Sequence, residues 1–110
     1  MRDILSAMED QELKQRKALI HQLNDERRKG LAAIEKQERM NLEVLDKKAD
    51  ERFNNCWPDF ILKQIEREKE RVRIEFKNER LKLDRELEVQ LKVGLQKIVE
   101  YRQQRMQTFA

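Results

Sequence analysis

Apolar residues recur along the chain with a spacing of eleven. They fall at Ile20, Leu31, Leu42 and Phe53 and, after an interruption and one residue out of phase, at Ile65, Phe76, Leu87, Ile98 and Phe109. Eleven residues over three turns is about 3.67 residues per turn, slightly more than in a free α-helix. The pattern predicts two long helices, at about 3–53 and 58–108, that pair almost straight or with a slight right-handed supercoil.

The apolar stripe of the first helix is narrow. Leu23, Ile34, Leu45 and Ala49 widen it, whereas Arg16, Arg27 and Glu38 stand where a third core position of each eleven would fall. Long charged side chains can cover such a seam with their stems while their charges reach water. We interpret the stripes as a core shared with a partner helix and predict that the chain forms a homodimer. The predicted oligomer interface consists of Ile20, Leu31, Leu42, Phe53, Ile65, Phe76, Leu87, Ile98 and Phe109.

Two stretches also alternate with a period of two, "RVRIEF" at 71–76 and "LEVQLKVGL" at 87–95. Alternation is a strand signal, but no two-residue turn or helix breaker bounds either run, so helix is favoured. As a helix, the second stretch places Leu91 and Leu95 on a front face with Tyr101, and Val89 and Val93 roughly opposite. A helix that is apolar on two sides is usually covered on two sides. These five residues are therefore candidates for contact with a partner.

The segment "FNNCWPDF", residues 53–60, interrupts the pattern. Asn54 and Asn55 tolerate the left-handed conformation that ends helices, and Pro58 suits the first turn of the next one. The segment is either the turn of an antiparallel helical hairpin or a kink at Pro58 in one continuous helix. At an exposed hairpin tip, Trp57 and Phe60 would form an apolar contact site. Inside a bundle they would be core.

Composition restricts the fold class further. Of 110 residues, 38% are hydrophobic and 43% charged, against roughly 25% charged in an ordinary globular domain, so a compact single-chain core is not expected. Disorder is the alternative, but the polar residues are mostly Glu, Lys, Arg and Gln, which are strong helix formers. The sequence predicts an all-α protein: a single coiled-coil module over residues 1–110, turning or kinking at 53–60, that oligomerises.

Charge and cysteine content bear on location. The net charge of +3 comes from acidic and basic residues mixed along the chain, which is typical of a solvated helix surface. No stretch approaches the roughly 18 apolar residues of a membrane span, so no membrane insertion is expected. Cys56 is the single cysteine and cannot form an intrachain disulfide. We expect a soluble intracellular protein, by default cytoplasmic.

Catalytic chemistry is not expected. The chain has one histidine, His21, and one cysteine, Cys56, far apart in sequence and without metal-ligand spacing. Two glycines cannot build a phosphate-binding loop. Carboxylates on a helix surface without a cleft have no reason to be tuned for proton transfer. We therefore expect no enzyme activity, metal or cofactor.

The expected function is non-enzymatic. We interpret the chain as an oligomerisation and protein–protein interaction module that contacts itself and at least one other protein as a scaffold, spacer or adaptor in an intracellular assembly. Coiled coils of this appearance occur in cytoskeletal, centrosomal and vesicle-tethering proteins, an analogy at the level of fold class. The alternative is nucleic-acid binding through the C-terminal basic residues Lys92, Lys97, Arg102 and Arg105.

Overall fold

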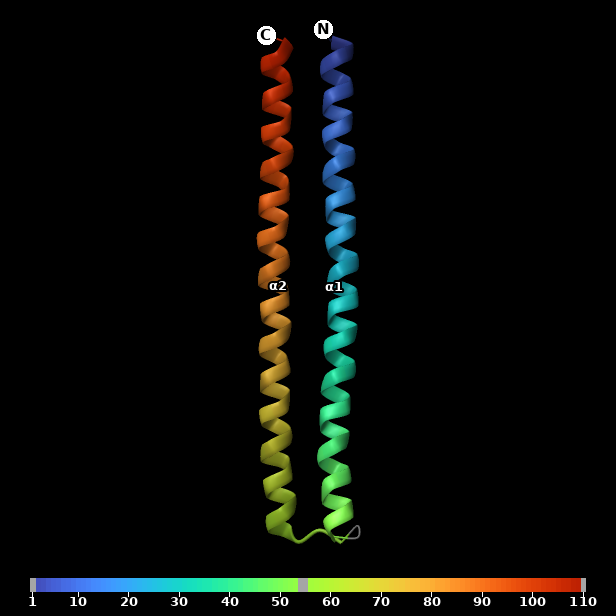
Figure 1. Cartoon of the computed structure of the whole chain (residues 1–110), viewed down its shortest axis with the longest axis vertical. Coiled ribbons are helices and arrows are strands. Elements are labelled where there is room, and N and C mark those ends of the chain that lie inside the picture. Colours follow the sequence, from blue (N-terminus) through green and yellow to red (C-terminus); the bar gives the residue numbers. More distant parts are fainter. Residues whose placement is uncertain (1, 54–55, 110) are drawn as a thin grey trace. The chain divides into compact units, whose positions relative to one another are not determined.

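The computed structural model describes residues 2–53 and 56–109 and contains two long helices. Helix α1 spans Arg2–Phe53 and helix α2 spans Asp59–Phe109 (Figure 1). Both predicted helices are confirmed: three of their four ends differ from the prediction by one residue, and the end at Phe53 matches it. The two stretches with a period of two lie inside α2, so in this protein the alternation does not form strands.

The helices are divided between two compact units. The terminal unit comprises Met1–Arg28 and Asp84–Ala110, and the turn unit comprises Lys29–Leu83. Within each unit, a segment of α1 lies beside a segment of α2 and runs in the opposite direction (Figure 1). Since the turn unit also contains the connection between the helices, the chain is a helical hairpin. This result decides against the continuous kinked helix.

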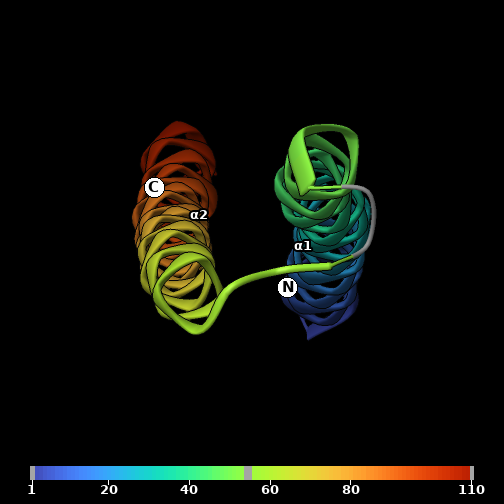
Figure 2. The same cartoon turned by 90° about the horizontal axis from the view of Figure 1, so that it is seen from below.

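The connection enters α2 through Pro58. Its carbonyl oxygen accepts hydrogen bonds from the backbone N–H groups of Ile61 and Leu62, at 3.0 and 3.1 Å. Proline is well suited to this place because a backbone N–H at a helix start would have no hydrogen-bond partner. The negative charge of Asp59 interacts favourably with the positive N-terminal end of the helix dipole. Figure 2 shows the segment 56–58 passing across to α2. The predicted roles of Asn54 and Asn55 lie outside the described residues.

Each unit has a core only one side chain deep. The buried apolar residues are Met8, Leu23 and Leu87 in the terminal unit, and Ala49, Ile65 and Phe76 in the turn unit. None of the described side chains is less than 2% exposed. Two paired helices can cover only one stripe of each other, so the remaining faces of both helices lie in solvent.

The three charged residues expected to cover the α1 seam all form ion pairs. Arg16 contacts Glu12, Arg27 donates to Asp84 at 2.8 Å, and Glu38 accepts from Arg80. The Asp84 hydrogen bond, with the attraction of its charge, raises the pKa of the Arg27 guanidinium above its usual value. The charges therefore reach partner side chains as well as water.

Candidate functional site

The predicted oligomer-interface residues of α2 are buried or half-buried within the chain itself. Ile65, Phe76 and Leu87 are buried in the seam, and Ile98 is half-buried. The α1 members lie at the edge of the seam instead: Ile20 is 45% exposed, and Leu31 and Leu42 are half-buried. The side chains of Phe53 and Phe109 lie outside the described part of the chain. The eleven-residue series is therefore buried more deeply on α2 than on α1: three of the four α2 members are buried, and none of the three α1 members is.

The terminal unit carries a groove between its two helix segments. Its volume is about 220 Å³. The lining consists of Ile20, Leu23, Asn24 and Arg27 from α1 and Asp84, Leu87, Glu88 and Leu91 from α2. The four apolar side chains come in equal number from the two helices, and the Arg27–Asp84 pair belongs to the same lining. An apolar groove with a charged rim is a common docking surface for an amphipathic helix.

The apolar surface continues beyond the groove. Leu13 precedes Ile20 by two turns and is 52% exposed, and Leu95 and Val99 follow Leu91 at four-residue steps and are half-buried. Residues four or seven apart share one side of a helix, so these residues extend the same surface. We call Leu13, Ile20, Leu91, Leu95 and Val99 the groove face.

The other predicted partner-binding residues of α2 lie on different sides. Val89 and Val93 are 59% and 48% exposed. Each stands two residues from Leu91, about 200° around the helix, so they point away from the groove face. Tyr101 is 48% exposed and lines a separate small hollow with Met8, Gln11 and other residues of the terminal unit. Leu91 therefore lines the groove with α1 residues and Leu95 extends it along α2, whereas Val89, Val93 and Tyr101 lie outside the groove.

The turn residues of the sequence prediction behave differently from one another. Phe60 is 68% exposed and Cys56 is exposed, whereas Trp57 is partly buried. The indole Nε1 of Trp57 is buried without a hydrogen-bond partner. Phe60 therefore presents an apolar surface at the turn, while the Trp57 ring packs against the chain.

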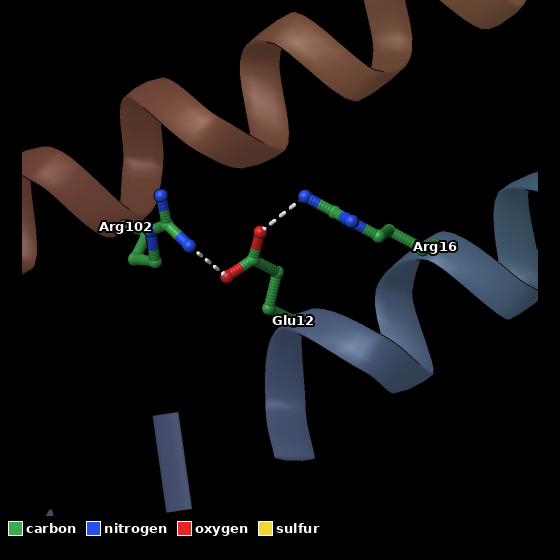
Figure 3. A network of polar contacts seen from close by, with 3 residues as sticks. All are labelled: Glu12, Arg16 and Arg102. Carbon is green, nitrogen blue, oxygen red and sulfur yellow. Dashed lines mark hydrogen bonds and ion pairs between the residues drawn. The ribbon is translucent and has the colours of Figure 1, made fainter. Parts of the chain in front are cut away.

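A buried carboxylate links the two helices of the terminal unit. Glu12 is 8% exposed, and its oxygens accept from Arg16 Nη2 of α1 at 2.7 Å and from Arg102 Nη1 of α2 at 2.9 Å (Figure 3). Both carboxylate oxygens are thus satisfied by cations, which offsets the cost of removing the charge from water. The Nε of Arg102 is buried without a partner. Such a network favours one register of the two helices, because a shift would separate Arg102 from the buried carboxylate of Glu12.

Three of the four C-terminal basic residues are engaged within the chain. Arg102 contacts Glu12, and Lys92 lies 3.5 Å from Glu88. Arg105 donates to Gln11 Oε1 at 2.8 Å and lies over the Tyr101 ring at 5.8 Å from its centre. A phosphate backbone would have to compete with these contacts for the cations.

The remaining chemistry-bearing side chains are dispersed. His21 lies 3.6 Å from Asp25 on the exposed side of α1. Across residues 2–53 and 56–109, no group of three or more His, Cys, Asp or Glu side chains is arranged to hold a metal ion. Among the described helices, none is long and apolar enough to cross a membrane.

Two features of the surface were missed by the sequence interpretation. The first is the contact of Glu12 with Arg102; the signal was available, since Glu12 precedes Leu23 by eleven residues and so occupies the same column of the repeat. The second is a row of unpaired bases, Lys63, Arg67 and Arg71, for which apolar periodicity gives no signal.

No known family model, curated protein or solved structure matches the chain.

Proposed function

We propose that this protein is a non-enzymatic helical-hairpin module that associates with a second copy of itself and with at least one other protein. In this role it is a scaffold, spacer or adaptor in an intracellular assembly. The partner helix of the second copy lies on the groove face of the terminal unit.

One observation carries the proposal: the hairpin exposes more of its large apolar side chains than it buries. Six apolar residues are buried among the described ones, whereas fourteen large ones are exposed. Isolated exposed apolar residues are ordinary, but in the terminal unit they adjoin a groove with an apolar lining. A second helix placed there would remove Ile20 and Leu13 from water, and each apolar side chain fully buried contributes about 1.5–3 kcal/mol.

The test is the mass in solution measured by light scattering over a concentration series. We expect two copies of the 13.5 kDa chain for the unaltered protein. Ile20→Asp and Leu95→Asp should shift the mass toward a single copy while the helical circular dichroism signal is retained, because both residues lie outside the buried seam. Gln22→Asp, an exposed neighbour of Ile20 on a different side of α1, is the matched control and should leave the mass unchanged.

An unaltered protein that stays at the mass of one chain at every concentration would refute self-association. A dimer that tolerates both groove-face substitutions would instead place the interface elsewhere. Leu87→Asp does not make this distinction, since Leu87 is buried in the seam and its loss would unfold the hairpin itself.

A further inference from the structure

Five bases of α2 in the turn unit, Lys63, Arg67, Arg71, Lys77 and Lys82, have no ion pair or hydrogen bond among the described residues, and the first three lie nearest the turn. Lys63, Arg67 and Arg71 follow one another at four-residue steps, so they form a row on one side of the helix. None of the three has an ion pair or hydrogen bond to another residue of the described chain. Three other bases of α2 in this unit do have acidic partners: Lys69 lies 2.7 Å from Asp46, Arg73 lies 3.5 Å from Glu70, and Arg80 pairs with Glu38. The three bases, which we call the basic ridge, are available to another molecule.

The basic ridge borders a hollow that has an aromatic end. Phe60, Lys63, Gln64, Arg67, Glu68 and Arg71 line this shallow depression of about 440 Å³. Phe60 is 68% exposed, the highest value among the exposed large apolar residues of the described chain. The hollow therefore offers an apolar contact beside three cations and one carboxylate, Glu68. A ligand that fits it combines negative charge with at least one apolar group.

We propose that the basic ridge binds an acidic helical segment of a partner protein. Successive bases are about 6 Å apart along the helix, because each residue rises about 1.5 Å. Carboxylates at four-residue steps on a facing helix have the same spacing and can meet all three cations. An apolar residue one turn away on that helix would reach Phe60. The inference rests on the proposed function in one respect, since it specifies the chemistry of the second partner.

The width of the ridge favours an acidic helix over nucleic acid. Glu66, Glu68 and Glu70 lie between the three bases in sequence, and all three are acidic side chains of the same helix segment. The positive strip is thus only one side chain wide. A duplex presents phosphates over a broad surface and needs several neutralised at once, so it would also meet these carboxylates. A single row of carboxylates on a helix placed in the hollow would meet only Glu68 of these three, because Glu66 and Glu70 are not part of its lining.

The test uses the full chain and a fluorescein-labelled synthetic peptide. The peptide is a helix former with Glu at three successive four-residue steps and Leu one turn before the first. Its control is a peptide of the same composition in which the Glu residues point in all directions. We expect the ordered peptide to bind more tightly in fluorescence anisotropy at low salt, and its affinity to fall as salt is added.

The variant Lys63→Gln/Arg67→Gln/Arg71→Gln should weaken peptide binding about tenfold, since exposed ion pairs contribute little singly and more as a row. Glutamine keeps the helix propensity, so folding is retained. Lys14→Gln/Lys17→Gln/Lys36→Gln removes the same charge from exposed bases of α1 and should change binding less than twofold. Phe60→Ala should weaken binding of the ordered peptide but not of a third peptide in which its Leu is replaced by Gln.

Equal loss in the two triple variants, or equal binding of the two peptides, would overturn the proposal. So would tighter binding of a duplex DNA of matched length that depends on the same three bases. The mass of the ridge variant separates this proposal from self-association: it should equal that of the unaltered protein. A chain that fails to dimerise but still binds the ordered peptide would refute self-association and leave the ridge assignment standing.

Discussion

Gly94 of α2 faces Leu19 of α1 so closely that a Cβ atom on residue 94 would lie 2.5 Å from Leu19 Cδ2. The turn unit contains the reciprocal arrangement, in which a Cβ on Gly30 of α1 would lie 2.7 Å from Leu83 Cδ2 of α2. In each unit a leucine therefore fills the space that a glycine on the opposite helix leaves. Glycine destabilises a helix interior by roughly 0.5–1 kcal/mol relative to alanine. At these two places its missing side chain makes room for a leucine in the seam.

Leucine at residue 94 should destabilise the terminal unit. Two leucine side chains would then compete for one space, and overpacking typically costs about 1–3 kcal/mol. We expect Gly94→Leu to lower the free energy of unfolding in urea, measured by circular dichroism at fixed protein concentration. Gln96→Leu, on the exposed side of the same turn, is the control and should change stability by less than about 0.5 kcal/mol.

The cause of that loss can be checked by restoring the space. Leu19→Ala/Gly94→Leu exchanges the large and small residues across the seam, so the double variant should be more stable than the sum of the two single changes implies. Coupling of residues in contact is about 0.5–3 kcal/mol. Additive effects would show that the Leu19 side chain can move aside without cost.

These glycine and leucine pairs form part of the seam that the apolar pattern of the sequence did not reveal. Leu19 and Gly30 are eleven residues apart, as are Leu83 and Gly94, so both pairs belong to the repeat. A search for apolar residues alone does not detect these positions of the repeat, because glycine contributes no apolar side chain. The apolar series that begins at Ile20 was more visible, although it stands one residue later and lies at the edge of the seam.

The helices themselves were predictable because their signals are local. The charged helix-forming residues, the eleven-residue period and Pro58 determined where α1 ends and α2 begins. The choice between a hairpin and a kink depends on contacts between distant residues, such as Asp46 with Lys69, which a single sequence does not display. For the same reason, the sequence indicated Leu91 and Leu95, the α2 residues of the groove face, but not that Leu13 of α1 belongs to the same surface.

Leu87 and Val89 provide a direct test of which side of α2 is the core. Leu87 is 8% exposed and Val89 is 59% exposed. Leu87→Ala should lower the free energy of unfolding by about 2 kcal/mol, the lower end for a buried leucine because the seam is narrow. Val89→Ala should change it by less than about 0.5 kcal/mol. Urea denaturation followed by circular dichroism measures both, and similar losses would mean that a partner also covers the Val89 side.

Removal of the Glu12 carboxylate should cost stability because it leaves Arg102 without its partner. Hydrogen bonds to charged groups contribute roughly 1.5–3 kcal/mol, and the exposure of both arginines reduces this, so we expect a loss of about 1–2 kcal/mol for Glu12→Ala. Glu9→Ala, at an exposed position without an ion pair in the described chain, is the control. Equal effects of the two changes would show that the network in Figure 3 contributes nothing measurable.

The same network allows a second comparison. Glu12→Leu/Arg102→Leu replaces the carboxylate and its partner on α2 by apolar groups and leaves the exposed Arg16 in water, and such replacements of buried ion pairs are often neutral or stabilising. We expect the double variant to unfold at a urea concentration similar to that of the unaltered protein, unlike Glu12→Ala. A double variant as unstable as Glu12→Ala would mean that the stems and shape of the polar side chains matter more than their charges.

Substitutions of Trp57 can show how much the turn contributes to stability apart from the helices. It lies between the end of α1 and the start of α2, so Trp57→Ala should leave the helical signal intact at low temperature. The loss of a partly buried ring should still lower the free energy of unfolding by about 1–2 kcal/mol. Trp57→Phe should cost less than about 0.5 kcal/mol, because it keeps an aromatic ring and removes the buried Nε1–H that has no hydrogen-bond partner. Circular dichroism and urea denaturation measure these changes, and a large loss of helical signal in Trp57→Ala would show that the ring holds the ends of α1 and α2 together.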